Sequence, residues 1–564
     1  MSAVDREDLL SIQLKALRAA ESPAAAELPM SATLSRLAHH GGLYQLLDEA
    51  ALQARIAPLF EVAKKRSTQE MPDAEGQATL FSAAAAVPAM TKFVSRKIAN
   101  YFSHLAGPPC HIPSSLMSHL VMPCAGRVYT SPDTERMTPH EFDSKAVPAA
   151  FTFVGQFIDH DLTLNALNLF ENQTANVVDS ATPLIDLDSV YGPREVLADH
   201  TKFPSVFDSN GRFLLRRSPD GVIDVPRDPP ETGTNAEYAR IFDGRNDENQ
   251  MILQVHILLM RLHNAFVSKF GDFETAKTKT ILNWQSFIIN DYLQKIIRND
   301  ILNNILMEVV KPNFGNLKHK PLLDLATNTL IGTMPHEFAI GFRMGHSQLR
   351  PGYEIQRGVT VRLFNNRLTP QIDGDGIFFD DLRGGQKLRV GHQIDWNFFL
   401  SSQLANGIDS HVTSVVFDLP ESTIPDEITF VGNLPHRNLI RSDKIGLCSG
   451  EALAAFYGVT ELPPDVIEPD QTAQSLFKTT GQFCTPLWYY LLREAEHEAA
   501  GMPVQTLGEL GSRLVGEVIV GGVAFSPDKH NYFKQPDPST WSITRVNAVT
   551  FQDILDFVAS DSDS

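Results

Sequence analysis

Apolar residues recur at helical spacing through the middle of the chain. In residues 245–266 the apolar positions follow an i, i+3, i+4, i+7 pattern, made by Ile252, Val255, Leu258, Leu259, Leu262 and Phe266. This is the pattern of one buried face of an α-helix, and we expect the helix to begin at Asn246 or Asp247. Residues 281–309 and 485–498 show the same periodicity, whereas strand signals are few and short. The pattern predicts a mainly α fold.

The chain divides into one large domain and two terminal segments. Residues 1–100 are predicted to form a helical N-terminal extension. Its first amphipathic helix is expected to dock on the body of the protein, with contact to a membrane surface as the alternative. No convincing linker interrupts residues 101–558, which we take as a single domain. The acidic residues 559–564 are predicted to be a disordered tail.

Two long loops stand out within this domain, at residues 129–148 and 216–233. Irregular segments of this length inside a compact domain are usually functional or lid-like. The second loop contains the sequence Ser-Pro-Asp-Gly at 218–221, which predicts a short hairpin. We therefore expect these loops to shape access to any site.

Charge and composition limit the possible functions. The 564 residues are 43% apolar and include 34 Phe, enough for a large buried core. Lys and Arg number 48 against 67 Asp and Glu, a net charge of −19 that disfavours binding to nucleic acid or anionic lipid. Four scattered cysteines are too few for a disulfide scaffold or a CxxC metal site, and they do not fix the redox compartment.

The sequence shows no export or membrane signal. Asp5, Glu7 and Asp8 stand where a secretory signal carries positive charge. The apolar runs at 80–90 and 515–525 are shorter than the roughly 20 residues that a spanning helix needs. We expect a soluble protein without a transmembrane segment, either cytoplasmic or exported by a non-classical route.

The densest group of ionisable residues in an apolar setting is Asp159, His160 and Asp161. Burying these three side by side is costly unless each has a partner. Neighbours on a helix point about 100° apart, so the three side chains must face three different surroundings. This favours a composite site over a solvated run of charge.

Further candidate residues occur as helical pairs. Arg245 and Glu248 are three residues apart, and on their own they suggest a surface ion pair. His256 and His263 share a helix face, but without carboxylates at metal-binding spacing we interpret them as hydrogen-bonded core histidines. His346 lies one turn after Arg343, and Asn438 and Arg441 are again three residues apart.

Oxygen ligands cluster between residues 182 and 192. Thr182, Asp186 and Asp188 alternate with main-chain carbonyls, an arrangement that suits Ca²⁺. The segment 371–381 is also rich in Asp and Gly. It lacks the ligand order of an EF-hand and is predicted to be a tight turn instead.

Taken together, these segments resemble the animal-type haem peroxidases of the peroxidase–cyclooxygenase superfamily, including its bacterial members. The motifs occur in the family's order as GQFIDHD, TPLIDLDSVYG, RNDEN, RLHN, FRMGHS and LPHRNLIR, spanning about residues 150–445. The resemblance implies a large helical fold around one haem b.

The resemblance also assigns roles on the peroxide side of the haem. His160 matches the distal histidine, which moves a proton between the two oxygens of H₂O₂. Arg245 matches the distal arginine, which stabilises developing negative charge. Gln156, one turn before His160, matches the glutamine that orders water or halide in the distal pocket.

Residues on the other side of the haem follow from the same comparison. His346 matches the proximal iron ligand, and Asn438 matches the residue that accepts the hydrogen bond from its ring. Arg343 and Arg441 match positions near the haem propionates. The usual RxRDHG that follows the asparagine is RSDKIG here, so contacts at the haem edge are expected to differ.

Covalent haem links and a calcium ion are implied as well. Asp159 and Glu248 match carboxylates that form ester bonds to haem, whereas Asn249 replaces the Met that forms a sulfonium link in one mammalian branch. The matching calcium ligands are Asp161, Thr182, the carbonyl of Leu184, Asp186 and Asp188. Because Asp161 follows His160, the ion would clamp the distal helix.

The implied function is a haem peroxidase. H₂O₂ would oxidise the haem to a ferryl species, which then takes electrons from small phenols, aromatic amines or halides. A fatty-acid dioxygenase of the same superfamily is the first alternative, but Arg343 stands where those enzymes carry a radical-forming Tyr. A haem-binding or adhesive protein without turnover is the second, and the presence of both His160 and Arg245 argues against it. The donor and the oligomeric state are not indicated.

Overall fold

The structure is a computed structural model of the chain. It describes residues 101–122, 126–130, 135–137, 147–163, 181–192, 200–228, 237, 239–311, 314–319, 333–365, 371–373, 376–420, 432–479, 481–502 and 504–561. The predicted extension 1–100, residues 562–564 of the predicted tail and much of loop 129–148 lie outside these residues. Helices dominate the described part and strands are short, which confirms the mainly α prediction.

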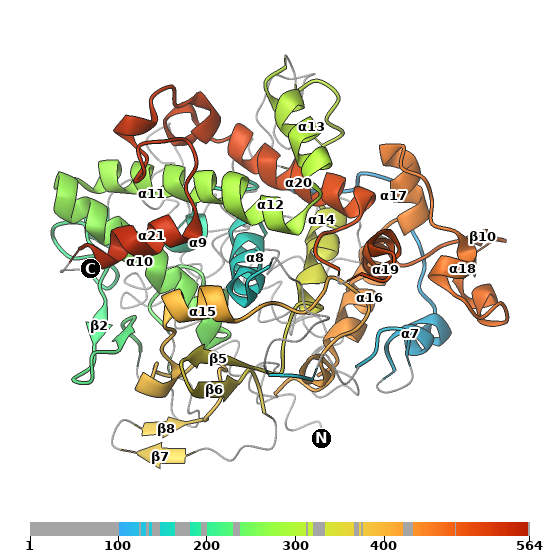
Figure 1. The fold of residues 1–564 in the computed structure, drawn as a ribbon, viewed down its shortest axis with the longest axis horizontal. Helices are drawn as coiled ribbons and strands as arrows, with labels where there is room; N and C mark the ends of the chain where they lie inside the picture. The colour runs from blue at the N-terminus through green and yellow to red at the C-terminus, as the bar shows by residue number, and fades with distance from the viewer. Residues whose placement is uncertain are drawn as a thin grey trace, which may run out of the picture.

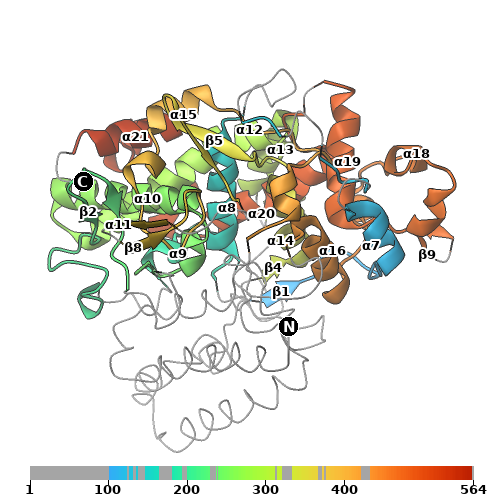
Figure 2. The ribbon, with the colours of Figure 1, turned by 90° about the horizontal axis from the view of Figure 1, so that it is seen from below.

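One central helix, α8 (Ala149–Leu162), organises the domain. Figures 1 and 2 show it between two groups of helices. On one side are α10 (Gln250–Phe270) and α11 (Phe273–Phe287), and on the other are α14 (His336–Gly341), α16 (Leu434–Lys444) and α19 (Leu487–Ala499). Twelve of its fourteen residues are buried, including Phe151, Phe153, Val154, Phe157 and Ile158. Because α8 is apolar on nearly every side, it is stable only as a core helix surrounded by others.

The predicted helix at 245–266 forms, but it begins later than expected. Helix α10 spans Gln250–Phe270, and Asn249 caps it by accepting hydrogen bonds from the main-chain nitrogens of Met251 and Ile252. The preceding residues form a separate 3₁₀ turn, η4 (Gly244–Asp247), capped by Asp243. Asn246 and Asp247 therefore do not start the helix. A cap requires a side-chain oxygen that reaches the free amides, and only Asn249 is positioned to do so.

The helical pattern at 281–309 is not one helix. Helix α11 (Phe273–Phe287) passes into a π-helical turn, η5 (Ile288–Tyr292), followed by α12 (Leu293–Ile296) and α13 (Asn299–Val309). At the break, the Ile296 carbonyl accepts a hydrogen bond from the Leu507 nitrogen (2.9 Å), and the Arg298 nitrogen donates to Ser512 Oγ (3.1 Å). These contacts satisfy backbone groups that a continuous helix would have paired internally.

The C-terminal part supplies the other half of the helical core. Helices α14, α19 and α20 pack on one another, and α13 packs on α20. The predicted helix at 485–498 is confirmed as α19. The remaining α-helices are α7 (Ser114–Val121), α9 (Asp188–Tyr191), α14 (His336–Gly341), α15 (Trp396–Ser402), α16 (Leu434–Lys444), α17 (Gly450–Tyr457), α18 (Pro464–Ile467), α19 (Leu487–Ala499), α20 (Glu509–Ala524) and α21 (Phe551–Ala559).

Strands in the described residues form five two-stranded pairs and no larger sheet. The one parallel pair joins segments far apart in the chain, β1 (Tyr101–Ser103) and β4 (Thr333–Pro335). The antiparallel pairs are β2 (Arg216–Arg217) with β3 (Ile223–Asp224), β5 (Gly352–Gln356) with β6 (Val359–Arg362), β7 (Gln371–Asp373) with β8 (Gly376–Phe378), and β9 (Lys478–Thr479) with β10 (Gln482–Phe483). The predicted hairpin at 218–221 is confirmed. Residues 374 and 375, where the predicted turn within 371–381 falls, lie outside the described residues.

One further contact spans most of the chain. Cys110 and Cys484 form a disulfide with a Cα–Cα separation of 5.8 Å, while Cys448 is a buried free thiol. Among the described residues, α10 alone is long and apolar enough to cross a membrane. Of its most apolar stretch, 89% is buried inside the protein, as expected for a core helix.

Candidate active site

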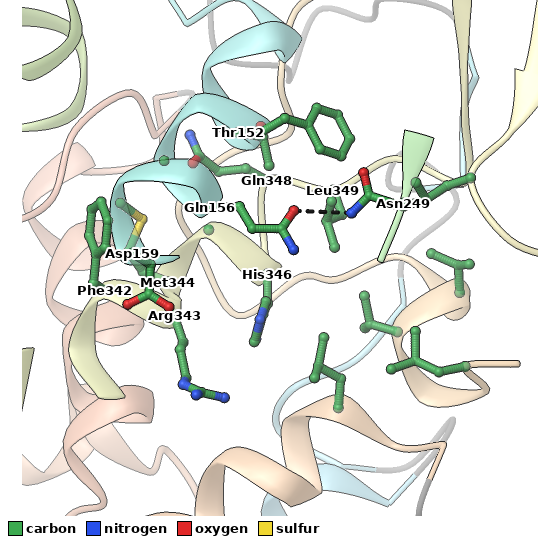
Figure 3. Close-up of a pocket in the computed structure, with 18 of the residues that line it drawn as sticks. Thr152, Gln156, Asp159, Asn249, Phe342, Arg343, Met344, His346, Gln348 and Leu349 are labelled. Carbon is green, nitrogen blue, oxygen red and sulfur yellow. Dashed lines mark hydrogen bonds between the residues drawn. The ribbon is translucent and has the colours of Figure 1, made fainter. Parts of the chain in front are cut away.

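A cavity lies between α8 and the 3₁₀ segment η7 (Phe342–His346). Helix α8 contributes Gln156 and Asp159 to its wall, and η7 contributes Arg343 and His346. Figure 3 shows the hydrogen bond between Gln156 and Asn249, with Arg343 and His346 extending from the neighbouring η7 segment. The other lining residues are Thr152, Phe153, Gly155, Asn249, Tyr292, Phe342, Met344, Gly345, Gln348, Leu349, Leu363, Phe364, Val415, Val416, Leu419 and Leu434. The mainly apolar lining with a few polar side chains is typical of a cofactor pocket.

The three ionisable neighbours on α8 face three different surroundings, as their helical spacing predicts. Asp159 lines the cavity. His160 is buried and turns toward Asn246, with 2.9 Å between its Nδ1 and Asn246 Oδ1. Asp161 is fully buried and accepts hydrogen bonds from the loop after residue 181. One turn of helix thus serves the cavity, a hydrogen-bonded network and an acidic cluster.

His160 belongs to a chain of three side chains. Its Nδ1–H donates to Asn246 Oδ1, and Asn246 Nδ2 donates to His256 Nδ1 over 3.0 Å. Burial, followed by the charge of Arg245, lowers the pKa of His160, and burial lowers the pKa of His256 to about 4. Both imidazoles are therefore neutral at pH 7, and His160 is held in the tautomer that leaves Nε2 free of its proton.

Glu248 connects the cavity wall to His160. Gln156 Nε2 donates to Glu248 Oε1, and His160 Nε2 lies 3.8 Å from the same oxygen. Asn249 Nδ2 donates to Gln156 Oε1 over 3.2 Å. Both ends of the Gln156 amide are thus held by residues at the start of α10. His160 does not line the cavity itself, and Glu248 connects its Nε2 to Gln156 in the cavity wall.

Arg245 and Glu248 do not form the surface ion pair that their spacing suggests. Arg245 is buried, pairs with Asp243 and donates from Nη2 to the carbonyl of His160 over 2.8 Å. The interpretation was wrong because both residues are buried and have other partners: Arg245 pairs with Asp243, and Glu248 accepts from Gln156. Arg245 is not among the residues that line the cavity, and it places a positive charge against the main chain of α8.

The segment that carries Arg245, Asn246 and Glu248 is held in place by residues from other parts of the chain. Arg227, from the long loop 216–233, is buried and binds both carboxylate oxygens of Asp247 at 2.7 and 2.9 Å. Gly384 closes the other side, since a Cβ on this residue would lie 1.6 Å from the Asp247 carbonyl oxygen. This part of the predicted loop therefore anchors the site.

Asn438, on α16, lies behind His346. Its Nδ2 is 3.0 Å from His346 Nδ1, while its fully buried Oδ1 has no hydrogen-bond partner among the described residues. A half-turn of the amide exchanges the two atoms and lets Oδ1 accept from an Nδ1–H. Arg343 donates from Nε to the carbonyl of Ala339. Arg441, one turn after Asn438, is half-buried and does not line the cavity.

The predicted oxygen cluster is assembled in space. The carboxylates of Asp161, Asp186 and Asp188 each offer an oxygen within 4.8 Å of the others. Thr182 donates from its main-chain nitrogen to Asp188 and from Oγ1 to Asp186, both over 2.8 Å. Burial, followed by the charge of Asp186, raises the pKa of Asp161. Leu184 lies in the same loop, with its side chain buried. Close packing of three carboxylates suits a hard divalent cation.

The two histidines on α10 are core residues, as predicted. His256 bonds Asn246, and His263 contacts Tyr191 Oη and the Gly211 carbonyl, each at 2.9 Å. Sequence reasoning missed that His256 extends the network of His160. Asn246 follows the predicted site residue Arg245 directly, and its amide was considered only as a helix start.

Comparison with known proteins assigns a part of the chain to a family. The family model of the animal haem peroxidases matches residues 164–425. The chain therefore carries an animal haem peroxidase domain over these residues. A solved structure, peroxidase A from Dictyostelium discoideum, shares its fold with a TM-score of 0.52 at 16% identity, covering 81% of this chain and 93% of the other. Among curated proteins, none matches the chain significantly.

Two parts of the site lie outside the range that matches the animal haem peroxidase model. The match begins after α8, which carries Gln156, Asp159 and His160, and ends before α16, which carries Asn438. The fold brings both helices against the matched segment, which contains Arg245, Glu248 and His346. Family and fold together support an oxidoreductase of the peroxidase type.

Proposed function

We propose that the protein is a haem-dependent peroxidase that uses H₂O₂ to oxidise small phenols, aromatic amines or halides. The proposal is carried by one observation, the cavity between α8 and η7 that is lined by both His346 and Gln156. His160 is a neutral base with a fixed tautomer, and Glu248 connects it to Gln156 in that wall. A base and a metal-ligating imidazole beside one pocket suit reaction of peroxide at a haem.

The residues present fit a haem. The pocket has the mainly apolar lining that a large planar cofactor needs, together with an imidazole and a guanidinium from His346 and Arg343. The buried Oδ1 of Asn438 has no partner among the described residues, and it would accept the Nδ1–H of an imidazole bound to iron through Nε2. His346 would therefore hold the iron, with Arg343 available to a propionate. Bound haem would supply the oxidation by peroxide and the subsequent one-electron transfers.

This chain's own residues would control the proton and the charge. His160 Nε2 would accept a proton from the peroxide and return it to the departing oxygen, since Nδ1 is already committed to Asn246. Gln156, held by Glu248 and Asn249, would position water or halide at the cavity wall. Arg245, paired with Asp243, would keep a fixed positive charge behind the helix.

Ester links to haem are proposed at Asp159 and Glu248, which differ in position. Asp159 is in the cavity wall, whereas Glu248 reaches the wall through Gln156. Extraction of haem-loaded protein with acid and acetone separates free from esterified haem. In wild type treated with peroxide, haem colour should stay with the polypeptide after extraction. In the double variant Asp159→Asn, Glu248→Gln the haem should be extracted, and these two results together would establish the links.

A calcium ion is proposed at Asp161, Thr182, Asp186 and Asp188, with the carbonyl of Leu184. The ion would neutralise carboxylates that burial forces close together. It would also tie the C-terminal end of α8 to the following loop through Asp161. Its role would be to hold His160 in place, without contact with the substrate.

The fatty-acid dioxygenase alternative can be separated by experiment. Arg343 stands three residues before His346, where those enzymes carry Tyr, and Tyr292 is the one tyrosine in the described cavity wall. Haem-loaded protein should oxidise guaiacol with H₂O₂ and should not form hydroperoxide from fatty acid and O₂. Rapid hydroperoxide formation that is lost in Tyr292→Phe would favour the oxygenase. Fully loaded protein that produces no guaiacol colour would favour haem binding without turnover.

A further inference from the structure

Outside the cavity, a tyrosine and a histidine are joined by a short hydrogen bond. Tyr129 Oη lies 2.5 Å from His411 Nε2, and their rings meet edge to face with centroids 4.6 Å apart. The main chains are bonded as well, from the Tyr129 nitrogen to the Ser410 carbonyl (3.1 Å) and from the Val412 nitrogen to the Tyr129 carbonyl (2.9 Å). The geometry of the pair is thus set by the backbone.

Two carboxylates lie beside the other ring nitrogen of His411. Nδ1 is 3.4 Å from Asp409 Oδ1 and 3.8 Å from Glu496 Oε1, and Arg493 pairs with Glu496. Burial lowers the pKa of His411, but the hydrogen bond and charge of Asp409 and the charge of Glu496 outweigh burial and the opposing Arg493, so the pKa is raised. His411 is therefore a good acceptor for the phenol proton.

A second tyrosine–histidine pair in the protein shows what is special about the first. Tyr191 Oη lies 2.9 Å from His263 Nδ1, but both residues are buried, and burial lowers the pKa of His263 to about 3. That imidazole is a poor proton acceptor. Among the tyrosines whose side chains the structure describes, Tyr129 alone is exposed, at 38%. It thus combines access from solution with a basic partner.

The loop that carries His411 connects the Tyr129–His411 pair to the cavity. Ser347, next to His346, donates from Oγ to the Gly407 carbonyl over 3.0 Å, and Gly407 lies two residues before Asp409. Further along the same loop, Val415 lines the cavity. It is four positions after His411, so their Cα atoms are at most roughly 14 Å apart. The loop that carries His411 therefore also accepts a hydrogen bond from Ser347 and contributes to the cavity wall.

We propose that Tyr129 and His411 form a proton-coupled electron-transfer site at which electron-rich phenols or aromatic amines too large for the cavity are oxidised at the protein surface. This inference rests on the proposed peroxidase function, because the oxidant is haem that peroxide has oxidised. One electron passes from the Tyr129 phenol to that haem, and the phenol proton moves to His411 Nε2. A neutral tyrosyl radical remains beside an imidazolium that faces Asp409 and Glu496.

The cycle closes without a further reagent. A donor at the surface gives one electron to the Tyr129 radical, and the proton on His411 Nε2 returns to the phenol oxygen. The oxidised donor releases its own proton to water. Each passage reduces the oxidised haem by one electron and yields one donor radical.

The test maps the radical in haem-loaded full-length protein. Wild type is treated with H₂O₂ and frozen for electron paramagnetic resonance, and a second sample is trapped with a nitroso compound and digested for mass spectrometry. We expect a tyrosyl signal and an adduct on Tyr129. Neither measurement on wild type depends on the folding of a variant. An adduct confined to Tyr292 or another tyrosine would overturn the proposal.

Variants then test use by large donors, with guaiacol as the small donor and a phenol tethered to dextran as the large one. We expect the ratio of large-donor to small-donor rates to fall at least tenfold in Tyr129→Phe and in His411→Gln. Tyr532→Phe, a half-buried tyrosine bonded to the main chain, is the matched control and should keep the wild-type ratio. An unchanged ratio in Tyr129→Phe overturns the inference.

Failure of this inference is distinguishable from failure of the proposed function. If peroxide leaves the Soret band of wild type unchanged and guaiacol is not oxidised, both are wrong. If the Soret band responds and guaiacol is oxidised while no radical reaches Tyr129, the peroxidase assignment stands and the surface site is rejected.

Discussion

His346 Nδ1 lies 3.0 Å from the side-chain amide of Asn438, a residue 92 positions further along the chain. The pairing brings together η7 and α16, and it buries Asn438 completely. A neutral amide at this place would leave an iron-bound imidazole less anionic than a carboxylate would. Asn438 is therefore a residue through which the protein would set the potential of its haem.

Replacing Asn438 tests this relationship. Asn438→Asp should lower the midpoint potential of the haem iron, because a carboxylate draws the Nδ1 proton and increases electron donation from the ring. Asn438→Leu should weaken haem binding by about 10- to 100-fold, the usual effect of losing such a partner. Spectroelectrochemistry and haem titration provide the measurements. Lys444→Ala, at the exposed end of the same helix, is the control. Equal potentials in wild type and Asn438→Asp would contradict the account.

The pH dependence of the peroxide reaction should report His160. Burial and Arg245 lower its pKa, so the neutral base persists below the usual imidazole pKa of about 6.5. We expect the rate of haem oxidation by peroxide, measured by stopped flow, to be flat near neutral pH. It should fall only in more acid solution, as His160 becomes protonated. His160→Ala should slow this step by several orders of magnitude while haem stays bound.

Two substitutions of Asn246 test whether protonation of His160 sets this pH dependence. Asn246→Asp places a carboxylate 2.9 Å from Nδ1, which should raise the pKa of His160 and move the acid limb of the profile to higher pH. Asn246→Ala removes the hydrogen bond without adding charge and should not produce that upward shift. Identical pH profiles in wild type and Asn246→Asp would show that His160 is not the base.

Removal of calcium should destabilise the protein. A cation present at a hundredfold excess over its dissociation constant stabilises the folded state by about 2.7 kcal/mol. Chelation should therefore lower the melting temperature of wild type, whereas Asp186→Asn should start lower and respond little. Asp528→Asn, an exposed aspartate paired with Lys534, serves as the control. A melting curve unchanged by chelation would remove the calcium clamp.

Asn249 should have two separable effects. It caps α10 and also holds Gln156. Asn249→Ala should lower the free energy of unfolding by about 1 kcal/mol through loss of the cap. Asn249→Ser keeps a capping oxygen but is too short to reach Gln156, so it should restore stability and still alter oxidation of bromide or iodide. Halide oxidation equal to wild type in Asn249→Ser would separate Gln156 from the reaction.

Much of the helical core could be predicted because its periodicity is local. The apolar stripe of α10 and the pattern at 485–498 both correspond to real helices. The break at Ile297 and Arg298 could not be predicted, since it depends on backbone bonds to Leu507 and Ser512 more than 200 residues away. Helix ends likewise depend on which side chain reaches the free amides, as at Asn249.

The candidate site shows the same division. The residues around the cavity occur in recognisable motifs, so Gln156, Asp159, Arg343 and His346 could be identified from sequence. The contact of Arg227 with Asp247 could not, because a loop arginine carries no signal of burial. The pairing of Cys110 with Cys484 could not either, since the spacing of four cysteines does not choose among their three possible partners and 374 residues separate these two.

Haem titration of purified protein tests the central claim most directly. Wild type is expected to bind one haem with a Soret band typical of a histidine-ligated iron and to oxidise guaiacol when H₂O₂ is added. His346→Ala should lose the iron ligand and most of the haem. His436→Ala changes a histidine on α16 that does not line the cavity, and it should retain both. A wild-type protein that takes up no haem, or that binds it equally well without His346, would contradict the account.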